Sequence, residues 1–423
     1  MKILGSAVLF VWIASFAFAQ PSPDGERTNG WRSDIDTLLS YMKRQHYVYK
    51  SKPLPAALIT KTAALKESVD RFSDERMAFE LEKLMYHMHD GHSYVLPFVP
   101  NRGPSYYLPV HFYVFNDGVF VIDADEPYTG LIGYHVRTIN GISADSIVND
   151  MKSYIHQDNI HTAKWFAPTM LRFRGLHEMY GLKPSSQEVR MDLVDRNKRT
   201  VHQTVTFVHV TALNGIPKLI PSQLASSAPP PLYLSNVAKN FWLEKMPEKN
   251  LLYFQFNQVQ NEENESLSQF SKRLDGVLSA MKPRLFIIDV RHNNGGNKML
   301  LRPLIDVIKK YERSDSVASI VVITGRNTFS AAQVFIALID KETKILFAGE
   351  PSGSSPNFVG EEGNMFNLPW SGAMGNISYR YHENILGDTR QWIEPDFPVT
   401  LSSTAYFENQ DPVMMFLLNK FEH

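Results

Sequence analysis

A serine lies where a predicted strand turns into a predicted helix, a position from which a hydroxyl can act as a nucleophile. Ile320 to Ile323 is a β-branched run typical of a buried strand, and helix-forming residues begin directly after Ser330. The hydroxyl is then exposed at the carboxyl end of a strand, beside the free N–H groups of a helix N-terminus. Attack on a carbonyl needs an accessible oxygen and donors for the resulting oxyanion. The alternative is that Ser330 only caps the helix, as serines commonly do.

A pair of glycines ends the turn after an earlier predicted strand. Leu285 to Ile288 is apolar, and the turn that follows it closes with Gly295 and Gly296. Glycines adopt positive φ and let the backbone approach a ligand closely. We predict that the N–H groups of Gly295 or Gly296, together with that of Ala331, form an oxyanion hole. Each such donor typically lowers the barrier by ~3 kcal/mol.

A histidine that could activate the serine follows a predicted N-terminal helix. His92 stands in the sequence Asp90-Gly91-His92-Ser93, and Gly91 is the predicted C-cap of that helix. A serine hydroxyl is a weak nucleophile until a base removes its proton, and histidine suits this role near neutral pH. A base of this kind predicts that activity falls as the pH drops through the pKa of His92, which lies at about 6–7 if the fold shifts it only mildly. The alternative is a surface or capping histidine.

The two turns together resemble those of the tail-specific, or C-terminal-processing, serine peptidase family, including its tricorn-core branch. The matching residues are Asp289, Arg291, Asn293, Gly295, Gly296, Thr328, Phe329, Ser330, Ala331, Gly349-Glu350-Pro351, Pro356-Asn357 and Glu394-Pro395-Asp396. The resemblance extends from about Asn250 to the end of the sequence. It implies a crotonase-like ββα catalytic domain with a mostly parallel sheet. It also implies an endopeptidase that hydrolyses peptide bonds through an acyl-enzyme on Ser330.

The resemblance also bears on the base and on a third catalytic group. Much of the family uses a lysine from a turn about two dozen residues after the serine, but the corresponding turn here, Gly349 to Phe358, contains no lysine. The tricorn-like branch uses a histidine shortly after an N-terminal helical region, which matches His92. The family pattern places an acid near the end of the chain, where it would orient the imidazole. The candidates for this acid, in order of preference, are Asp388, Glu394 and Glu383.

Two neighbours of these turns have expected roles of their own. Asp289 and Arg291 stand at a strand end, and we predict that they pair and hold the glycine turn. Gln333 lies one helical turn beyond Ser330, where it either supports the nucleophile or faces solvent.

A cluster of histidines raises a competing hypothesis. His87, His89 and His92 fall within six residues, beside Asp90, and such clusters can bind zinc. Their order differs from the H-x-H-x-D-H pattern of metallo-β-lactamase-like hydrolases, and two residues that are two apart on a helix point to different faces. We therefore predict no metal and no cofactor, with a zinc-dependent hydrolase as an alternative. A further alternative is a catalytically inactive peptide- or ligand-binding protein on the same fold, because fold alone does not establish activity.

The chain of 423 residues is long enough for several domains. We predict a preceding small helical subdomain, a β-rich and possibly PDZ-like module, and a Pro-rich linker before the catalytic domain. The predicted boundaries are a signal peptide at 1–19, the helical subdomain at 20–92, the β-rich module at 93–215, the linker at 216–232 and the catalytic domain at 233–423.

Composition excludes several classes of function. The formal net charge is -1, so nothing indicates a nucleic-acid partner. Residues 1–19 combine a positive start, an apolar stretch and a small-x-small cleavage signal, which is typical of a secretory signal peptide. No second apolar run of that length follows, so we expect a mature chain without a membrane span. Cysteine is absent, which excludes disulfides and a thiol nucleophile. We predict an exported protein, periplasmic or secreted and soluble, that acts on a protein or peptide substrate.

Overall fold

The computed structural model describes residues 24–209, 219–224, 229–314, 318–361 and 363–421. The predicted signal peptide at 1–19 lies outside the described residues, as do 216–218 and 225–228 of the predicted linker. The chain divides into two compact units. Unit 1 comprises the described parts of Pro217–Asn357 and Glu383–His423, and unit 2 comprises the described residues up to Ile216 together with Phe358–His382. The chain therefore leaves unit 1 after Asn357 and returns to it after His382.

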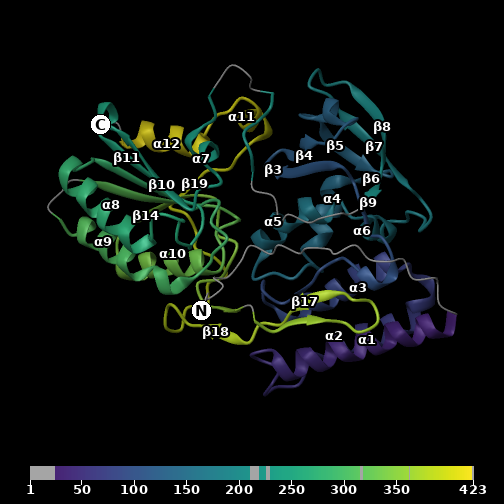
Figure 1. The fold of residues 1–423 in the computed structure, drawn as a ribbon. Helices are drawn as coiled ribbons and strands as arrows, with labels where there is room; N and C mark the ends of the chain where they lie inside the picture. The colour runs from purple at the N-terminus through teal and green to yellow at the C-terminus, as the bar shows by residue number, and fades with distance from the viewer. Residues whose placement is uncertain (1–23, 210–218, 225–228, 315–317, 362, 422–423) are drawn as a thin grey trace. The chain divides into compact units, whose positions relative to one another are not determined.

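The centre of unit 1 is a six-stranded sheet formed largely by the apolar runs that the sequence predicts as buried strands (Figure 1). In spatial order its strands are β10 (Phe241–Met246), β11 (Leu251–Phe256), β12 (Leu285–Asp289), β13 (Ser319–Thr324), β14 (Leu346–Gly349) and β19 (Phe397–Pro398). Neighbouring strands are parallel except for β10, which pairs with β11 in the antiparallel sense. The predicted mostly parallel sheet is confirmed, and the antiparallel edge strand was not predicted.

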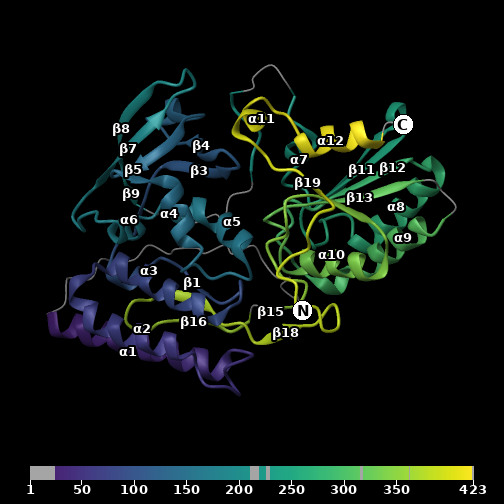
Figure 2. The same cartoon turned by 180° about the vertical axis from the view of Figure 1, so that it is seen from behind.

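Helices cover both faces of this sheet (Figures 1 and 2). One face carries α8 (Leu267–Met281), α9 (Arg302–Glu312) and α10 (Ala331–Glu342), and the other carries α12 (Pro412–Phe421). On the α12 side, Val413 and Leu417 belong to one apolar cluster with alternate residues of the strands, because side chains of a strand point to its two faces in turn. The shorter elements of unit 1 are α7 (Leu232–Ser235), α11 (Ser403–Phe407), η5 (Pro247–Lys249) and η6 (Lys298–Leu300).

Unit 2 contains a helical part that also takes in a segment from much later in the chain. Its elements are α1 (Asp24–Gln45), α2 (Ala56–Ser68), η1 (Val69–Arg71), α3 (Asp74–Met85), η2 (Tyr86–Met88), β1 (Tyr94–Val95), η3 (Pro100–Arg102), β15 (Phe358–Gly360), β16 (Met365–Asn367), β17 (Met374–Asn376) and β18 (Arg380–His382). Strands β1, β17 and β16 form one small sheet, and β15 pairs with β18. Phe366, Leu368 and Ile377 lie in the same buried apolar cluster as Trp31 and Leu38 of α1. The later segment is therefore part of this core.

The rest of unit 2 is the β-rich region that the sequence predicts. Its antiparallel sheet has the order β3 (Val110–Phe115), β4 (Gly118–Ala124), β5 (His135–Ile139), β7 (Glu188–Val194) and β8 (Thr200–Thr206). Hairpin turns fall at Asn116-Asp117 and at Arg196 to Lys198. The accompanying elements are β2 (Tyr106–Tyr107), η4 (Thr129–Leu131), β6 (Ile142–Ser143), α4 (Ala144–Met151), α5 (Ile160–Met170), α6 (Arg174–Met179) and β9 (Val208–His209).

One predicted helix boundary differs from the structure. The helical stretch begins after Ser73, whose hydroxyl accepts a hydrogen bond from the N–H of Arg76 at 3.0 Å and so caps α3. The left-handed residue that ends this helical stretch is His89, with φ of 55°, and not Gly91, so that prediction is wrong. Further along, α5 and α6 are separate helices, because Phe173 between them is extended. Among the described residues, no helix combines the length and the apolar character needed to cross a membrane.

Candidate functional site

Ser330 forms the turn between β13 and α10, and its backbone is strained. Its φ and ψ are 57° and −123°, a combination that is costly for a residue with a Cβ atom. Strain of this kind concentrates at functional sites. The residue is half-buried, and among the described residues of α10 its side chain finds no capping hydrogen bond. The alternative in which Ser330 only caps the helix therefore loses its support.

The glycine turn after β12 packs directly against the Ser330 turn. The N–H of Phe329 donates to the carbonyl of Asn293 at 3.1 Å. A Cβ atom placed on Gly295 would lie 2.6 Å from the Ser330 Cβ and 3.0 Å from the Ala331 nitrogen, and the φ of Gly295 is 111°. Both the space and the conformation at this position therefore require glycine. The structure brings together Ser330, Ala331 and Gly295, which the sequence placed in separate motifs.

The backbone N–H groups at this junction differ in their availability. The N–H of Gly295 donates to the Oδ1 of Asn293 at 3.0 Å, so this amide already has an acceptor. Gly296 forms a parallel bridge with Val259. The N–H of Val259 donates to the carbonyl of Gly295, and its carbonyl accepts the N–H of Asn297. Because these bonds go to the residues on either side of Gly296, the N–H of Gly296 itself points away from Val259. Ala331 is the first residue of α10, and its N–H has no intrahelical acceptor. Gly296 and Ala331 are thus better placed than Gly295 as oxyanion donors.

An arginine between two carboxylates holds the start of the glycine turn. The guanidinium of Arg291 contacts Asp289 at 2.8–3.1 Å and forms a two-point hydrogen bond with Asp411 at 2.9 and 3.1 Å. Asp411 in turn accepts the N–H groups of Val413 and Met414 and so caps α12. The guanidinium loses hydration on burial, but the two carboxylates outweigh this loss and raise the pKa of Arg291. The predicted pairing of Asp289 with Arg291 is confirmed, whereas Asp411 was not foreseen.

The turn after β14 is fastened to the Ser330 turn by a second arginine. Arg326 donates to both carboxylate oxygens of Glu350, at 2.7 and 2.8 Å. The N–H of Gly353 donates to the carbonyl of Thr328 at 3.0 Å. Gln333 is fully buried, so its predicted solvent-facing alternative is wrong. These contacts explain why the motif residues around Gly349-Glu350-Pro351 accompany the serine turn.

His92 belongs to unit 2, on a loop organised by the buried carboxylate of Asp90. One oxygen of Asp90 accepts the N–H groups of His92 at 2.8 Å and Ser93 at 2.5 Å, and the hydroxyl of Ser378 at 2.9 Å. The other oxygen lies 3.0 Å from the Nε2 of His46. The Nδ1 of His46 accepts the N–H of Val48, which places the proton on Nε2 as a donor to Asp90.

Burial determines the protonation of this loop. Burial lowers the pKa of His92 to about 4; Asp90 acts in the opposite direction, and His156 lowers the pKa further. Burial also opposes the charged form of Asp90, but the hydrogen bonds from His46 and Ser93 and the nearby histidines outweigh it, so the pKa of Asp90 is lowered. The predicted pKa of 6–7 for His92 is therefore too high, because the sequence does not reveal that the imidazole is only 5% exposed.

The three candidate acids lie in unit 1, and each has a local partner. The carboxylate of Asp388 contacts Arg390 at 2.6–3.2 Å, which lowers its pKa. The same guanidinium contacts Asp340 at 2.5 Å. Glu394 accepts the indole N–H of Trp392 at 2.5 Å, and Glu383 accepts the N–H of Gly387 at 3.4 Å. The assignment of Asp388 as the third catalytic group stays a prediction.

The clustered histidines do not converge. His87 lies in η2, and His89 follows it in the left-handed conformation, with Tyr86 packed edge-on against both rings. Burial lowers the pKa of His87. Within the described ranges, no group of three or more His, Cys, Asp or Glu side chains is arranged to hold a metal ion.

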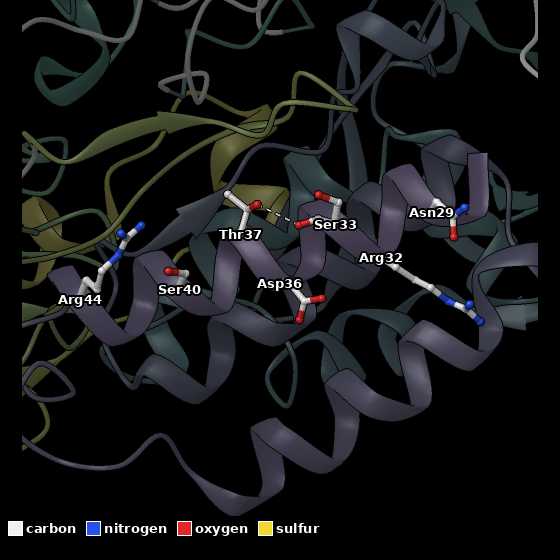
Figure 3. Close-up of a pocket in the computed structure, with 7 residues that line it drawn as sticks. All are labelled: Asn29, Arg32, Ser33, Asp36, Thr37, Ser40 and Arg44. Atoms are coloured by element: carbon white, nitrogen blue, oxygen red, sulfur yellow. Dashed lines mark hydrogen bonds between the residues drawn. The ribbon is translucent and has the colours of Figure 1, made fainter. Parts of the chain in front are cut away.

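A shallow depression of about 540 Å³ runs along α1 (Figure 3). Its lining residues all come from one side of this helix: Asn29, Arg32, Ser33, Asp36, Thr37, Ser40 and Arg44. The hydroxyl of Thr37 is used locally, since it donates to the carbonyl of Ser33 at 2.8 Å. The depression is open and contains none of the predicted site residues, so it adds nothing to the candidate site.

Comparison with known proteins indicates the fold. No family model matches the sequence, and no curated protein matches it. The structure of mature CPAF complexed with lactacystin is similar, with a TM-score of 0.63 and 12% identity over 94% of this chain and 98% of that chain. A serine-to-alanine mutant of CPAF gives a TM-score of 0.62 and 11% identity over 94% and 97%. The photosystem II D1 C-terminal processing protease has 12% identity over 93% of this chain and 97% of that chain. Its TM-score of 0.40 is too low to support an argument.

These likenesses establish a mixed α/β fold with helices and several sheets, shared with CPAF. At 11–12% identity they concern the fold and leave the activity to be argued from the site. The crotonase-like and PDZ-like descriptions remain predictions.

The packing of the two turns leads to the first prediction. Replacing Gly295 with Ala should reduce activity about 10²-fold or more, because the added methyl group displaces Ser330, and displacements of about 1 Å have such effects. The matched control is Gly103→Ala, where φ is also positive, at 118°, but nothing lies within 4 Å of the added atom. Peptidase activity and urea unfolding would be measured for both. Equal activity in the two variants would contradict the proposed close packing.

Proposed function

We propose that this protein is a serine endopeptidase that forms an acyl-enzyme on Ser330. The observation that carries the proposal is the strained Ser330 backbone, packed against a glycine turn and followed by the N–H of Ala331, which has no intrahelical acceptor. A half-buried hydroxyl presented in this way can attack a carbonyl carbon, which is the first step of acyl transfer. The likeness to CPAF supports the fold on which this chemistry would occur.

The proposed reaction has two halves. The Ser330 oxygen bonds to the carbonyl carbon of the peptide, and the carbonyl oxygen becomes an oxyanion held by the N–H groups of Gly296 and Ala331, at ~3 kcal/mol for each donor. Breaking the C–N bond releases the amine and leaves an ester on Ser330. A water molecule then attacks this ester, which releases the acid product and restores the Ser330 hydroxyl.

We assign the general base to His92. In the first half the imidazole takes the proton of the Ser330 hydroxyl and passes it to the leaving amine, and in the second half it takes a proton from the attacking water. The low pKa supports this role, since the imidazole stays neutral at physiological pH. The missing lysine between Gly349 and Phe358 also supports it. The assignment requires unit 2 to present His92 to Ser330, with Asp388 as the proposed orienting acid.

The proposal includes export to the periplasm or the medium, because residues 1–19 have the pattern of a secretory signal peptide. A protein or a peptide is then the substrate. One observation favours the alternative of a binding protein without turnover: Asp388 is already engaged by Arg390.

Replacing Ser330 with Ala should abolish hydrolysis of an unfolded protein substrate and leave the circular dichroism spectrum unchanged, because only the nucleophilic oxygen is lost. Ser355→Ala is the matched control, since Ser355 is also half-buried in unit 1 but lies outside both turns. Activity should be insensitive to a strong chelator. Full activity in Ser330→Ala would end the proposal, and a chelator effect that zinc reverses would favour the zinc hydrolase.

The position of His92 can be tested through a thiol, because the chain has no cysteine of its own. Ser330→Cys introduces a single thiol, whose rate of alkylation by iodoacetamide reports its pKa. The neutral imidazole of an adjacent His92 should take the thiol proton, and the resulting imidazolium pairs with the thiolate, so the thiol pKa should fall from about 8.5 by a unit or more. Adding His92→Asn to Ser330→Cys should return the thiol pKa to about 8.5, whereas adding the control His87→Asn should leave the thiol pKa lowered. An ordinary thiol pKa in Ser330→Cys alone would argue against the pair.

The pH dependence of kcat/KM follows from the pKa of His92. The base must be neutral to accept a proton, so activity should be constant from neutral pH downward and fall to half near pH 4. Initial rates on a fluorogenic peptide would be measured from pH 3.5 to 8, with the circular dichroism spectrum recorded at each pH. A fall centred at 6–7 with the fold intact would show that the working imidazole is solvated or paired with an acid.

A further inference from the structure

Phe358 stacks against two imidazole rings in unit 2, those of His92 and His382. The rings of His92 and Phe358 are nearly parallel, at 7°, with centroids 5.4 Å apart. Phe358 also stacks against His382, at 4.8 Å and 23°. All three side chains are buried, with exposed fractions of 5–6%. Phe358 thus contacts two imidazoles, and one of them is the proposed base.

The backbone around Phe358 fixes the spacing of the stack. Phe358 and His382 are directly opposite each other in the antiparallel pair of β15 and β18. Two residues further along, a Cβ atom on Gly360 would lie 3.3 Å from the Cε1 of His92 and 2.8 Å from the Cε2 of Phe358. The missing side chain at Gly360 leaves the room in which the two rings meet. The main chain of His92 is also held, because its carbonyl accepts the side-chain N–H of Asn376 at 2.8 Å.

We propose that Phe358 is a positioning residue that sets the plane of the His92 imidazole and shields one of its faces from water. This inference rests on the proposed function, in which His92 transfers protons to and from Ser330. The loop around Asp90 fixes the backbone of His92 through hydrogen bonds. Those bonds leave rotation about the Cβ–Cγ bond of the side chain, and this torsion is broad for histidine. A flat ring against the imidazole restricts it.

Shielding by Phe358 also bears on the charge of the imidazole. The groups that act on His92 are the carboxylate of Asp90, which favours the proton, and His156, which disfavours it. At the second imidazole that Phe358 contacts, the Nε2 of His382 lies 3.4 Å from a carboxylate oxygen of Glu361. An aromatic ring is neutral and excludes water, so it disfavours the charged imidazolium through desolvation. A neutral imidazole with a fixed plane is the state that a general base requires.

The test compares Phe358→Leu with two other variants of the full chain. Leucine keeps an apolar side chain but has no flat face. We expect kcat to fall about 10- to 100-fold with KM changed less than about twofold, because the base is displaced and substrate binding is not. The acid limb of the pH profile should move upward from about 4 towards the ordinary value near 6.5. Phe358→Tyr retains the ring and should restore kcat to within about threefold of the original protein.

The matched control is Phe366→Leu, the same substitution in the same unit at a similarly buried phenylalanine that packs against Tyr41. Both leucine variants lose stability, so stability alone cannot distinguish them. A loss of kcat and a shifted acid limb of the pH profile that occur only in Phe358→Leu support the inference. Equal kcat and an unchanged limb in the two variants would overturn it.

Failure of the inference can be distinguished from failure of the proposed function. The pKa of His92 can be read from the pH dependence of its ring-proton NMR signal, assigned with His92→Asn. If Ser330→Ala retains activity, the proposed function fails. A raised NMR pKa in Phe358→Leu would still show that the Phe358 ring controls His92, and an unchanged pKa would overturn that control as well.

Discussion

The backbone of Ser330 is the constraint on which the arrangement of unit 1 depends. A positive φ at a residue with a side chain costs on the order of 1–3 kcal/mol, so the surroundings must hold it in place. Phe329 is bound to Asn293, Thr328 is bound to Gly353, and Gly295 leaves no gap behind the serine. These contacts come from the turns that follow β12 and β14, the two parallel strands on either side of β13. Ends of neighbouring parallel strands meet at one edge of a sheet, so the fold itself brings the restraints together.

In unit 2, the buried carboxylate of Asp90 likewise holds several segments in place. Asp90 is fully buried, and isolated burial of a charge would be strongly unfavourable. Donors from three separate segments compensate it: the Nε2 of His46, the N–H groups of His92 and Ser93, and the hydroxyl of Ser378. The conformation of the His92 loop is thus linked to α1 and to the late segment Phe358–His382. Removing any one donor would leave a buried acceptor with a poorer set of partners, which is costly.

The sequence was informative wherever local pattern decides structure. The strand and the helix around Ser330 follow from propensity and spacing, and the structure agrees with both. The helix end at His89 could not be predicted, because glycine is the usual left-handed residue and Gly91 stands two positions away. Asp411 holds Arg291 across 120 residues of sequence, and no local signal marks such a pair.

Burial is the second quantity that the sequence conceals. His92 could be recognised as a base by its type and its neighbours, yet its pKa depends on groups that arrive from elsewhere in the fold. The ring of Phe358 packs against it. The sequence places Phe358 in the predicted catalytic domain, whereas in the structure it belongs to unit 2. The prediction of 6–7 was an ordinary histidine value, and a value of about 4 requires the environment to be known.

The path of the chain between the two units gives Asn357 a specific role. Its side-chain oxygen accepts the N–H groups of Asn384 at 2.8 Å and Ile385 at 3.0 Å, so the segment Phe358–His382 begins and ends at one place in unit 1. In unit 2, the pairing of β15 with β18 brings the two ends of this segment together again. Two closures in series restrict the segment more than either would alone, because each removes conformational freedom from the same loop. The residue that follows Asn357 is Phe358. The side chain that covers His92 is therefore joined by a single peptide bond to the residue that orders the loop of Asp388.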